Sequence, residues 1–151
     1  MPLRKHTTLT NEDITLLAIA SGGGRGLTPV QLQKALFLVG QSGLPDLPKD
    51  FYPFFPYNYG PFHPQVYADA DALTARGLVV QVPILGKSWS EYRATPPGLD
   101  YTKKKQKEAS KRFVEYLNAV AAWVRSVSFE QLLRAIYKSY PEFREKSVFQ
   151  G

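Results

Sequence analysis

The sequence predicts an α+β fold that is mostly helical and carries one small antiparallel β-hairpin. Five segments place apolar residues at helical spacing behind a capping residue. Two alternating segments, 78–85 and 89–95, flank a short Gly-Lys-Ser turn, a pattern typical of a hairpin. At 151 residues the chain has the length of one domain, and with no cysteine it cannot form disulfides or zinc–thiolate sites.

The first two helices have clear start signals. Thr10 is a favourable N-cap, and Asp13 at the third helical position lies near the positive end of the helix dipole. Thr28 followed by Pro29 opens the second helix. The glycine-rich run 22–26 between them has no strand before it and no Gly-Lys-Ser/Thr after it, so we interpret it as a flexible connector rather than a phosphate-binding loop.

The segment 54–62 is aromatic but interrupted by prolines, which favours an edge or irregular strand and then a rigid turn at Gly60–Pro61. A third helix is expected from Pro64, a favoured first-turn residue. Gly77 supplies a left-handed cap, and the hairpin follows directly. Helix, glycine, strand, basic turn and strand is the order in which a winged helix builds its third helix and wing.

The C-terminal part is predicted to be helical. The segment 95–127 has the longest helical pattern and is expected to form one continuous helix. Ser128 caps a last helix. We therefore predict a single domain over 1–151, with a winged-helix-like core over 10–95 and a C-terminal helical extension over 96–151.

Positive charge is concentrated in one block. The net charge is +6, and the run KKKQKEASKR at 103–112 contributes six basic residues and one acid. On a continuous helix, Lys103, Lys107 and Lys111 recur every four residues and would form one basic ridge. Such a ridge suits either an anionic partner or plain exposure to solvent. The candidate nucleic-acid-binding residues are Lys87, Arg93, Lys103, Lys104, Lys107 and Lys111.

Contacts to the DNA backbone are expected rather than base recognition. A winged helix usually reads bases with its third helix, but here that helix offers the carboxylates of Asp69 and Asp71. Lys87 at the hairpin tip and Arg93 on the return strand lie where a wing reaches phosphates. Trp89 is expected either to stack on a base or, more commonly, to pack against a neighbouring helix.

A protein partner is the second hypothesis. Aromatic side chains are enriched in interfaces. The turn residues Tyr57, Tyr59 and Phe62 are the candidate partner-binding residues, and their alternative role is local core packing.

Residues for catalysis are scarce. The only histidines are His6 and His63, and His63 beside a proline is expected to cap the third helix. Asp69 and Asp71 point different ways on a helix, and Asp46 lies in a loop with no partner in view. We predict no enzyme activity, cofactor or metal. No membrane-spanning run or signal peptide is visible, so a cytoplasmic protein is expected, and a homodimer is compatible with the sequence.

Two short motifs carry a family resemblance. The segment 32–37, LQKALF, is followed by Tyr59-Gly60-Pro61-Phe62 and then Val66-Tyr67. Together they resemble the Panacea (SocA-like) antitoxin domain. The chain is also similar to a group of uncharacterised bacterial proteins that share the Tyr-Gly-Pro core and a tail like Tyr140-Pro141-Glu142.

The resemblance implies a mostly helical, winged-helix-like fold. It further implies an antitoxin that binds its cognate toxin directly. The chain departs from that family in having Ala35 and Phe37 where leucine and tyrosine are usual, and in its hairpin and basic segment. Two functions therefore stay open: a regulatory protein with weakly specific DNA-backbone binding, and an antitoxin-like adaptor that binds a partner through the aromatic turn.

Overall fold

The structure is a computed structural model that describes residues 9–148. Within that range the chain forms six α-helices and two antiparallel two-stranded sheets, so the predicted α+β class is confirmed. His6 lies outside the described residues. The helices are α1 (Asn11–Ala20), α2 (Pro29–Gly40), α3 (Pro64–Ala75), α4 (Pro96–Glu108), α5 (Lys111–Ser126), α6 (Phe129–Ser139) and the short 3-10 helix η1 (Pro141–Arg144). The strands are β1 (Phe55–Tyr57), β2 (Gly60–Phe62), β3 (Val79–Pro83) and β4 (Ser90–Ala94).

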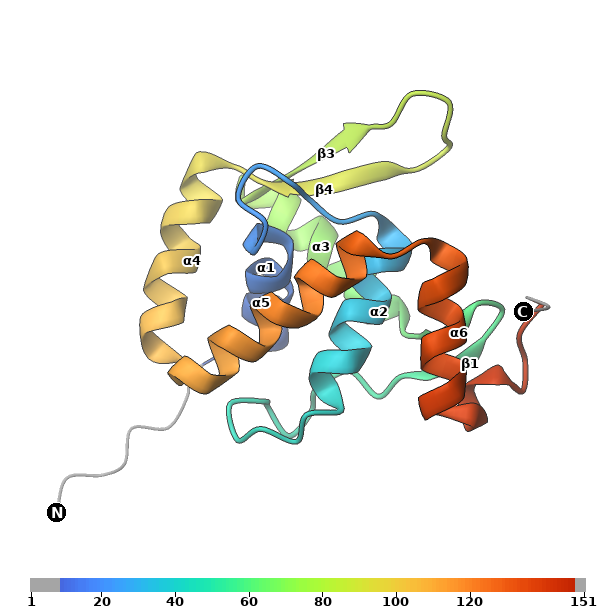
Figure 1. Ribbon diagram of the computed structural model, residues 1–151. Coiled ribbons are helices and arrows are strands. Elements are labelled where there is room, and N and C mark those ends of the chain that lie inside the picture. The colour runs from blue at the N-terminus through green and yellow to red at the C-terminus, as the bar shows by residue number, and fades with distance from the viewer. Residues whose placement is uncertain (1–8, 149–151) are drawn as a thin grey trace, which may run out of the picture.

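Helices α1, α2 and α3 form the centre of the molecule, and α5 crosses over α1 and α2 (Figure 1). Helix α4 lies at one edge, while α6 and the β1–β2 hairpin lie at the opposite edge. The β3–β4 hairpin projects beyond the helices. Backbone hydrogen bonds of 3.0 and 2.8 Å between Leu27 and Tyr92 join the segment before α2 to β4.

Most of the predicted helix ends are confirmed. Three helices begin with a capping box, in which an N-cap hydroxyl and the side chain at the third helical position exchange backbone hydrogen bonds. The boxes pair Thr10 with Asp13, Thr28 with Gln31, and Ser128 with Gln131. Pro64 is the first residue of α3, and Gly77, with φ of +77°, follows its end in the left-handed conformation.

Two connected groups of apolar side chains make up the core. The first includes Ile14 of α1, Leu73 of α3 and Phe113 of α5, all fully buried. The second joins Phe37 of α2 to Leu133 of α6. The ring of Phe37 is surrounded by those of Phe54, Tyr140 and Phe143, whose centroids lie 5.6, 5.1 and 4.7 Å away, respectively. Edge-to-face rings of this kind stabilise a core beyond the area that they bury.

The prediction of one continuous helix over 95–127 was wrong. The helix is interrupted at Ala109 and Ser110, so that α4 and α5 are separate helices. Asp46 stabilises the break, because its carboxylate accepts hydrogen bonds from the Ser110 amide at 2.7 Å and from the Ser110 hydroxyl at 2.8 Å. The same hydroxyl accepts from the Phe113 amide and caps α5. Asp46, expected to lack a partner, is therefore buried and bonded.

The glycine run 22–26 is not a flexible connector. The guanidinium of Arg125, on α5, donates to the carbonyl of Gly26 at 2.9 Å and to the Ser21 hydroxyl at 3.0 Å. It also donates to carbonyls at the end of α1. A Cβ on Gly22 would lie 2.7 Å from Arg125 Cζ, and one on Gly26 would lie 1.9 Å from the Tyr92 carbonyl oxygen. Glycine is required at position 26 because the Tyr92 backbone approaches it closely, whereas a Cβ at position 22 would require the Arg125 side chain to move.

The β1–β2 hairpin was not predicted. Its prolines, Pro56 and Pro61, lie opposite each other in the ladder. An antiparallel ladder alternates hydrogen-bonded with non-hydrogen-bonded pairs, and a pair of prolines fits the second kind because no amide donor is needed there. Gly60 ends the connecting turn with φ of +86°. The predicted edge strand is therefore half of a second, small sheet.

Candidate functional site

The motif residues of α2 hold the β1–β2 hairpin and the start of α3. The side-chain amide of Gln33, only 1% exposed, donates to the His63 carbonyl at 2.9 Å and accepts from the His63 amide at 3.0 Å. The ring of His63 accepts from the Gln65 amide through Nδ1 and caps α3, as predicted. The Leu-Gln-Lys motif and the Gly-Pro-Phe turn are thus parts of one hydrogen-bonded unit.

Lys34 is the most unusual member of this unit. Its side chain is 3% exposed, and Nζ donates to the Pro61 carbonyl at 2.9 Å. Among residues 9–148, no carboxylate forms an ion pair with it. Burial lowers the pKa of Lys34 to about 7, because the charged form loses its hydration. The sequence alone gave no sign of this role beyond the presence of a lysine on an apolar helix.

The predicted partner-binding residues lie on the hairpin that this unit supports. Tyr57 and Tyr59 are 48% and 45% exposed, whereas Phe62 is partly buried. The rings of Tyr57 and Phe62 stack with their centroids 4.9 Å apart, and Phe55, also exposed, lies beside both. At least two of the three predicted side chains can therefore be reached from solvent.

A groove continues from Tyr59 to the β3–β4 hairpin. It has a volume of about 530 Å³ and lies between the hairpin and the starts of α2 and α6. Trp89 and Phe129 line it and are 46% and 41% exposed. The ring of Phe129 lies edge-on to that of Tyr59 at 5.5 Å, and the ammonium of Lys87 lies 5.4 Å from the centroid of the Trp89 ring. Sequence reasoning missed Phe129, although an aromatic residue at the first position of a helix is a usable signal.

The six candidate nucleic-acid-binding residues lie on α4, α5 and the β3–β4 hairpin, and the predicted ridge of Lys103, Lys107 and Lys111 is interrupted by the helix break. Lys103, Lys104 and Lys107 are exposed on the second half of α4. Lys111 lies across the helix break, 4.0 Å from Glu115. The remaining two lie on the β3–β4 hairpin: Lys87 at its tip and Arg93 in β4, paired with Glu91. The hairpin tip and the end of α4 lie on opposite sides of the molecule (Figure 1).

The outward polar side chains of α3 are engaged within the molecule. Asp69 accepts hydrogen bonds from the Tyr52 hydroxyl at 2.5 Å and from the side-chain amide of Gln65 at 2.9 Å. Asp71 accepts from the Gln81 amide, and Arg76 pairs with Glu12. The two aspartates face different partners, as predicted, and do not form a carboxylate pair. Helix α3 therefore offers DNA bases few free donors.

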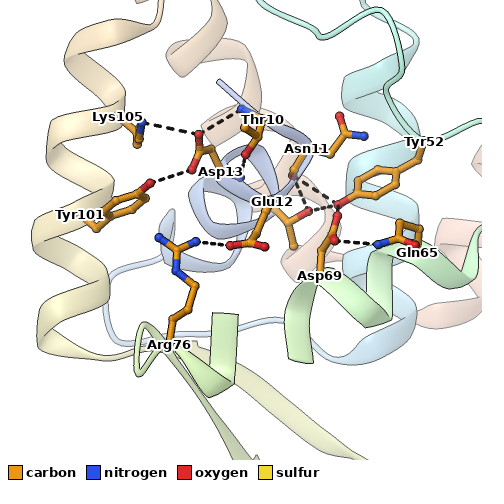
Figure 2. A network of polar contacts seen from close by, with 11 residues as sticks. Thr10, Asn11, Glu12, Asp13, Tyr52, Gln65, Asp69, Arg76, Tyr101 and Lys105 are labelled. Carbon is orange, nitrogen blue, oxygen red and sulfur yellow. Dashed lines mark hydrogen bonds and ion pairs between the residues drawn. The ribbon is translucent and has the colours of Figure 1, made fainter. Parts of the chain in front are cut away.

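A polar network, shown in Figure 2, lines a cavity of about 760 Å³ between α1, α3 and α4. Asp13, 3% exposed, accepts from the Tyr101 hydroxyl at 3.1 Å, and Lys105 Nζ lies 3.7 Å from it. The Thr15 and Tyr52 hydroxyls are 2.7 Å apart. Burial, followed by the hydrogen bond to Asp69, raises the pKa of Tyr52. Asp13 and Asp69 both accept from donors within the molecule, so the network ties α4 and Tyr52 to α1 and α3.

No protein-family model, curated protein or solved structure matches this chain. Within residues 9–148, no group of three or more histidine, aspartate or glutamate side chains could hold a metal ion. In the same range, no helix is both long and apolar enough to cross a membrane. The functional argument therefore depends on the surfaces described above.

Proposed function

We propose that this protein is a partner-binding module whose recognition surface is the aromatic face. This face consists of the exposed rings around the β1–β2 hairpin and the adjoining groove: Phe55, Tyr57, Tyr59, Trp89 and Phe129. The observation that carries the proposal is that all five are at least 40% exposed. Large apolar side chains gathered on one surface mark interaction sites, and aromatic residues are enriched there.

The support beneath this face favours the same function. Lys34 bonds the hairpin backbone at Pro61, and Gln33 bonds the backbone of His63, the residue directly after the hairpin. On the α6 side, Tyr137 and Leu133 lie within 4 Å of where a Cβ on Gly60 would be. A surface that is rigid before its partner arrives loses less conformational entropy on binding. A cognate toxin is the class of partner that the resemblance to antitoxins implies, and neutralisation would be by direct contact. The chain itself would not act as an enzyme.

Site-specific photo-crosslinking in the source organism tests the proposal. A benzoyl-phenylalanine at Tyr57 is expected to crosslink one discrete protein, whereas the same probe at Lys104 on α4 is not. With that partner purified, Tyr57→Ala is expected to weaken binding at least about 30-fold, the effect of an interface hot spot of ~2 kcal/mol. Crosslinks from position 104 alone would reject the proposal.

DNA-backbone binding, in a regulatory protein, is the second candidate. The observation that favours it is the group of exposed lysines on α4, Lys103, Lys104 and Lys107. The break before α5 reduces the expected contacts to about three phosphates, so log K against log salt would have a slope of about −2.7 at ~0.9 per phosphate. The double reversal Lys103→Glu, Lys107→Glu would then weaken binding to every sequence alike. Asp71→Ala, on α3, is the control that leaves it unchanged.

A further inference from the structure

The groove beside the β1–β2 hairpin is lined mostly by apolar surface. Tyr59, Trp89, Phe129 and Leu132 all line it, and the Tyr59 and Phe129 rings lie 5.5 Å apart. Trp89, Phe129 and Tyr59 keep 46%, 41% and 45% of their surface exposed. An occupant that covers these rings would remove a large apolar area from water, at ~25 cal/mol for each Å².

The charge that lines the groove is positive. Lys87 is the one charged side chain that lines it, and none of the lining residues among 9–148 is an aspartate or glutamate. Its ammonium lies over the Trp89 ring, 5.4 Å from the ring centroid. The other polar side chains at this place, Thr28 and Gln31, bond each other's backbone in the capping box of α2. An occupant therefore meets one cation next to apolar walls.

We propose that the groove binds an apolar segment of the partner protein that carries an acidic residue, whose carboxylate pairs with Lys87. This inference rests on the proposed function, because Tyr59 belongs both to the groove and to the hairpin surface. A nucleic-acid strand fits less well, since a single lysine in the groove does not balance a chain of phosphates. An apolar segment with one or two carboxylates matches both the walls and the charge.

The test is a selection of random twelve-residue peptides on the immobilised full chain, with Trp89→Ala as the counter-selected variant. The enriched peptides are expected to share at least two large apolar residues and one aspartate or glutamate. A synthetic consensus peptide is then titrated by fluorescence anisotropy. Lys87→Glu is expected to weaken binding of the consensus peptide at least tenfold. The same variant is expected to bind more tightly a peptide in which the acidic residue is replaced by lysine. Lys138→Glu, an equal charge change at an exposed position on α6, is the control that changes affinity less than twofold.

Three results would overturn the inference. One is no enrichment on the wild-type chain over Trp89→Ala. Another is an enriched consensus without an acidic residue. The third is a single-stranded DNA 20-mer whose binding is lost in Trp89→Ala, which would assign the groove to nucleic acid. Because Lys87 lies in an exposed turn, Lys87→Glu is expected to fold even where a tryptophan variant does not.

The outcome for the groove is separable from that for the proposed function. If a partner crosslinked at Tyr57 binds Trp89→Ala and Lys87→Glu like the wild type, the groove inference fails and the partner-binding function stands. If consensus peptides bind the groove but no partner depends on Tyr57, the proposed function fails, and peptide binding by the groove no longer supports binding of that partner.

Discussion

Lys34 shows how a single residue can set the pH response of the fold. It is buried, no carboxylate among residues 9–148 pairs with it, and it donates a hydrogen bond to the carbonyl of Pro61. The pKa of Lys34 is lowered from 10.5 to about 7 in the folded chain. Between these two values the unfolded chain binds more protons than the folded chain, so stability rises with pH through this window.

The free energy of unfolding is therefore expected to increase between pH 7 and pH 9.5, with a slope of up to ~1.4 kcal/mol per pH unit from this group. Lys34→Met keeps the volume of the side chain and removes the titration, so we expect the slope to fall by that amount. Urea unfolding at several pH values measures it. Lys138→Met, at an exposed position, is the matched control; an equal fall in that variant would contradict the assignment.

At the scale of elements, the break between α4 and α5 decides where the basic residues lie. Asp46 accepts two hydrogen bonds from Ser110, and Ser110 in turn caps α5. The cap and the bound carboxylate together fix the angle between two helices. Without them the apolar and basic periodicity would allow the helix to continue.

Ser110→Ala is expected to lower the free energy of unfolding by ~1–2 kcal/mol, since it removes a cap and a bond to a buried carboxylate. Asp46→Ala is expected to have an effect of about the same size. The double variant is expected to cost less than the sum, because both changes remove the same contact. Denaturant melts measure the cycle, with Ser139→Ala as a control at an exposed helix end. Strict additivity would show that the two side chains act independently.

Local signals predicted more of this fold than distant ones did. Thr10, Thr28 and Ser128 could be identified as caps because a capping box lies within four residues of the chain. The helix break could not, because Asp46 precedes Ser110 by 64 positions. The β1–β2 hairpin could not be predicted because prolines are usually excluded from the interior of a sheet.

The candidate sites follow the same rule. The aromatic turn could be predicted only as either a partner-binding surface or local core, and the groove that reaches Trp89 and Phe129 depends on how two hairpins and α6 pack. The burial of Lys34 depends on the Pro61 carbonyl, 27 positions away. Pairs of this separation leave no periodic trace in a single sequence.

At the scale of the whole molecule, two surfaces with different chemistry lie on opposite sides. The aromatic face lies by the β1–β2 hairpin and α6, and the exposed lysines lie on α4 at the other edge (Figure 1). Apolar contact depends little on ionic strength, whereas phosphate contact depends on it strongly. Salt therefore distinguishes the two proposed functions.

If the aromatic face is the binding site, raising the salt from 50 to 200 mM is expected to change partner affinity less than about fivefold, because only Lys87 contributes an ion pair. Binding of duplex DNA through three lysines of α4 would weaken about 40-fold over the same range. Isothermal titration calorimetry or anisotropy at four salt concentrations measures both. A partner whose affinity falls as steeply as that of DNA would point to α4 instead.

The position of α5 also has a consequence for synthesis of the protein. Phe113 and Leu117 belong to α5, which packs over α1 and α2, yet they follow those helices by dozens of residues. At ~5–20 residues per second, a ribosome needs about 2 to 6 seconds to proceed from residue 96 to residue 126. During that interval the nascent chain presents Ile14 and Leu36 without their final cover. A chaperone that binds apolar segments would meet this chain then, before Arg125 is available to tie the glycine loop to the end of α1.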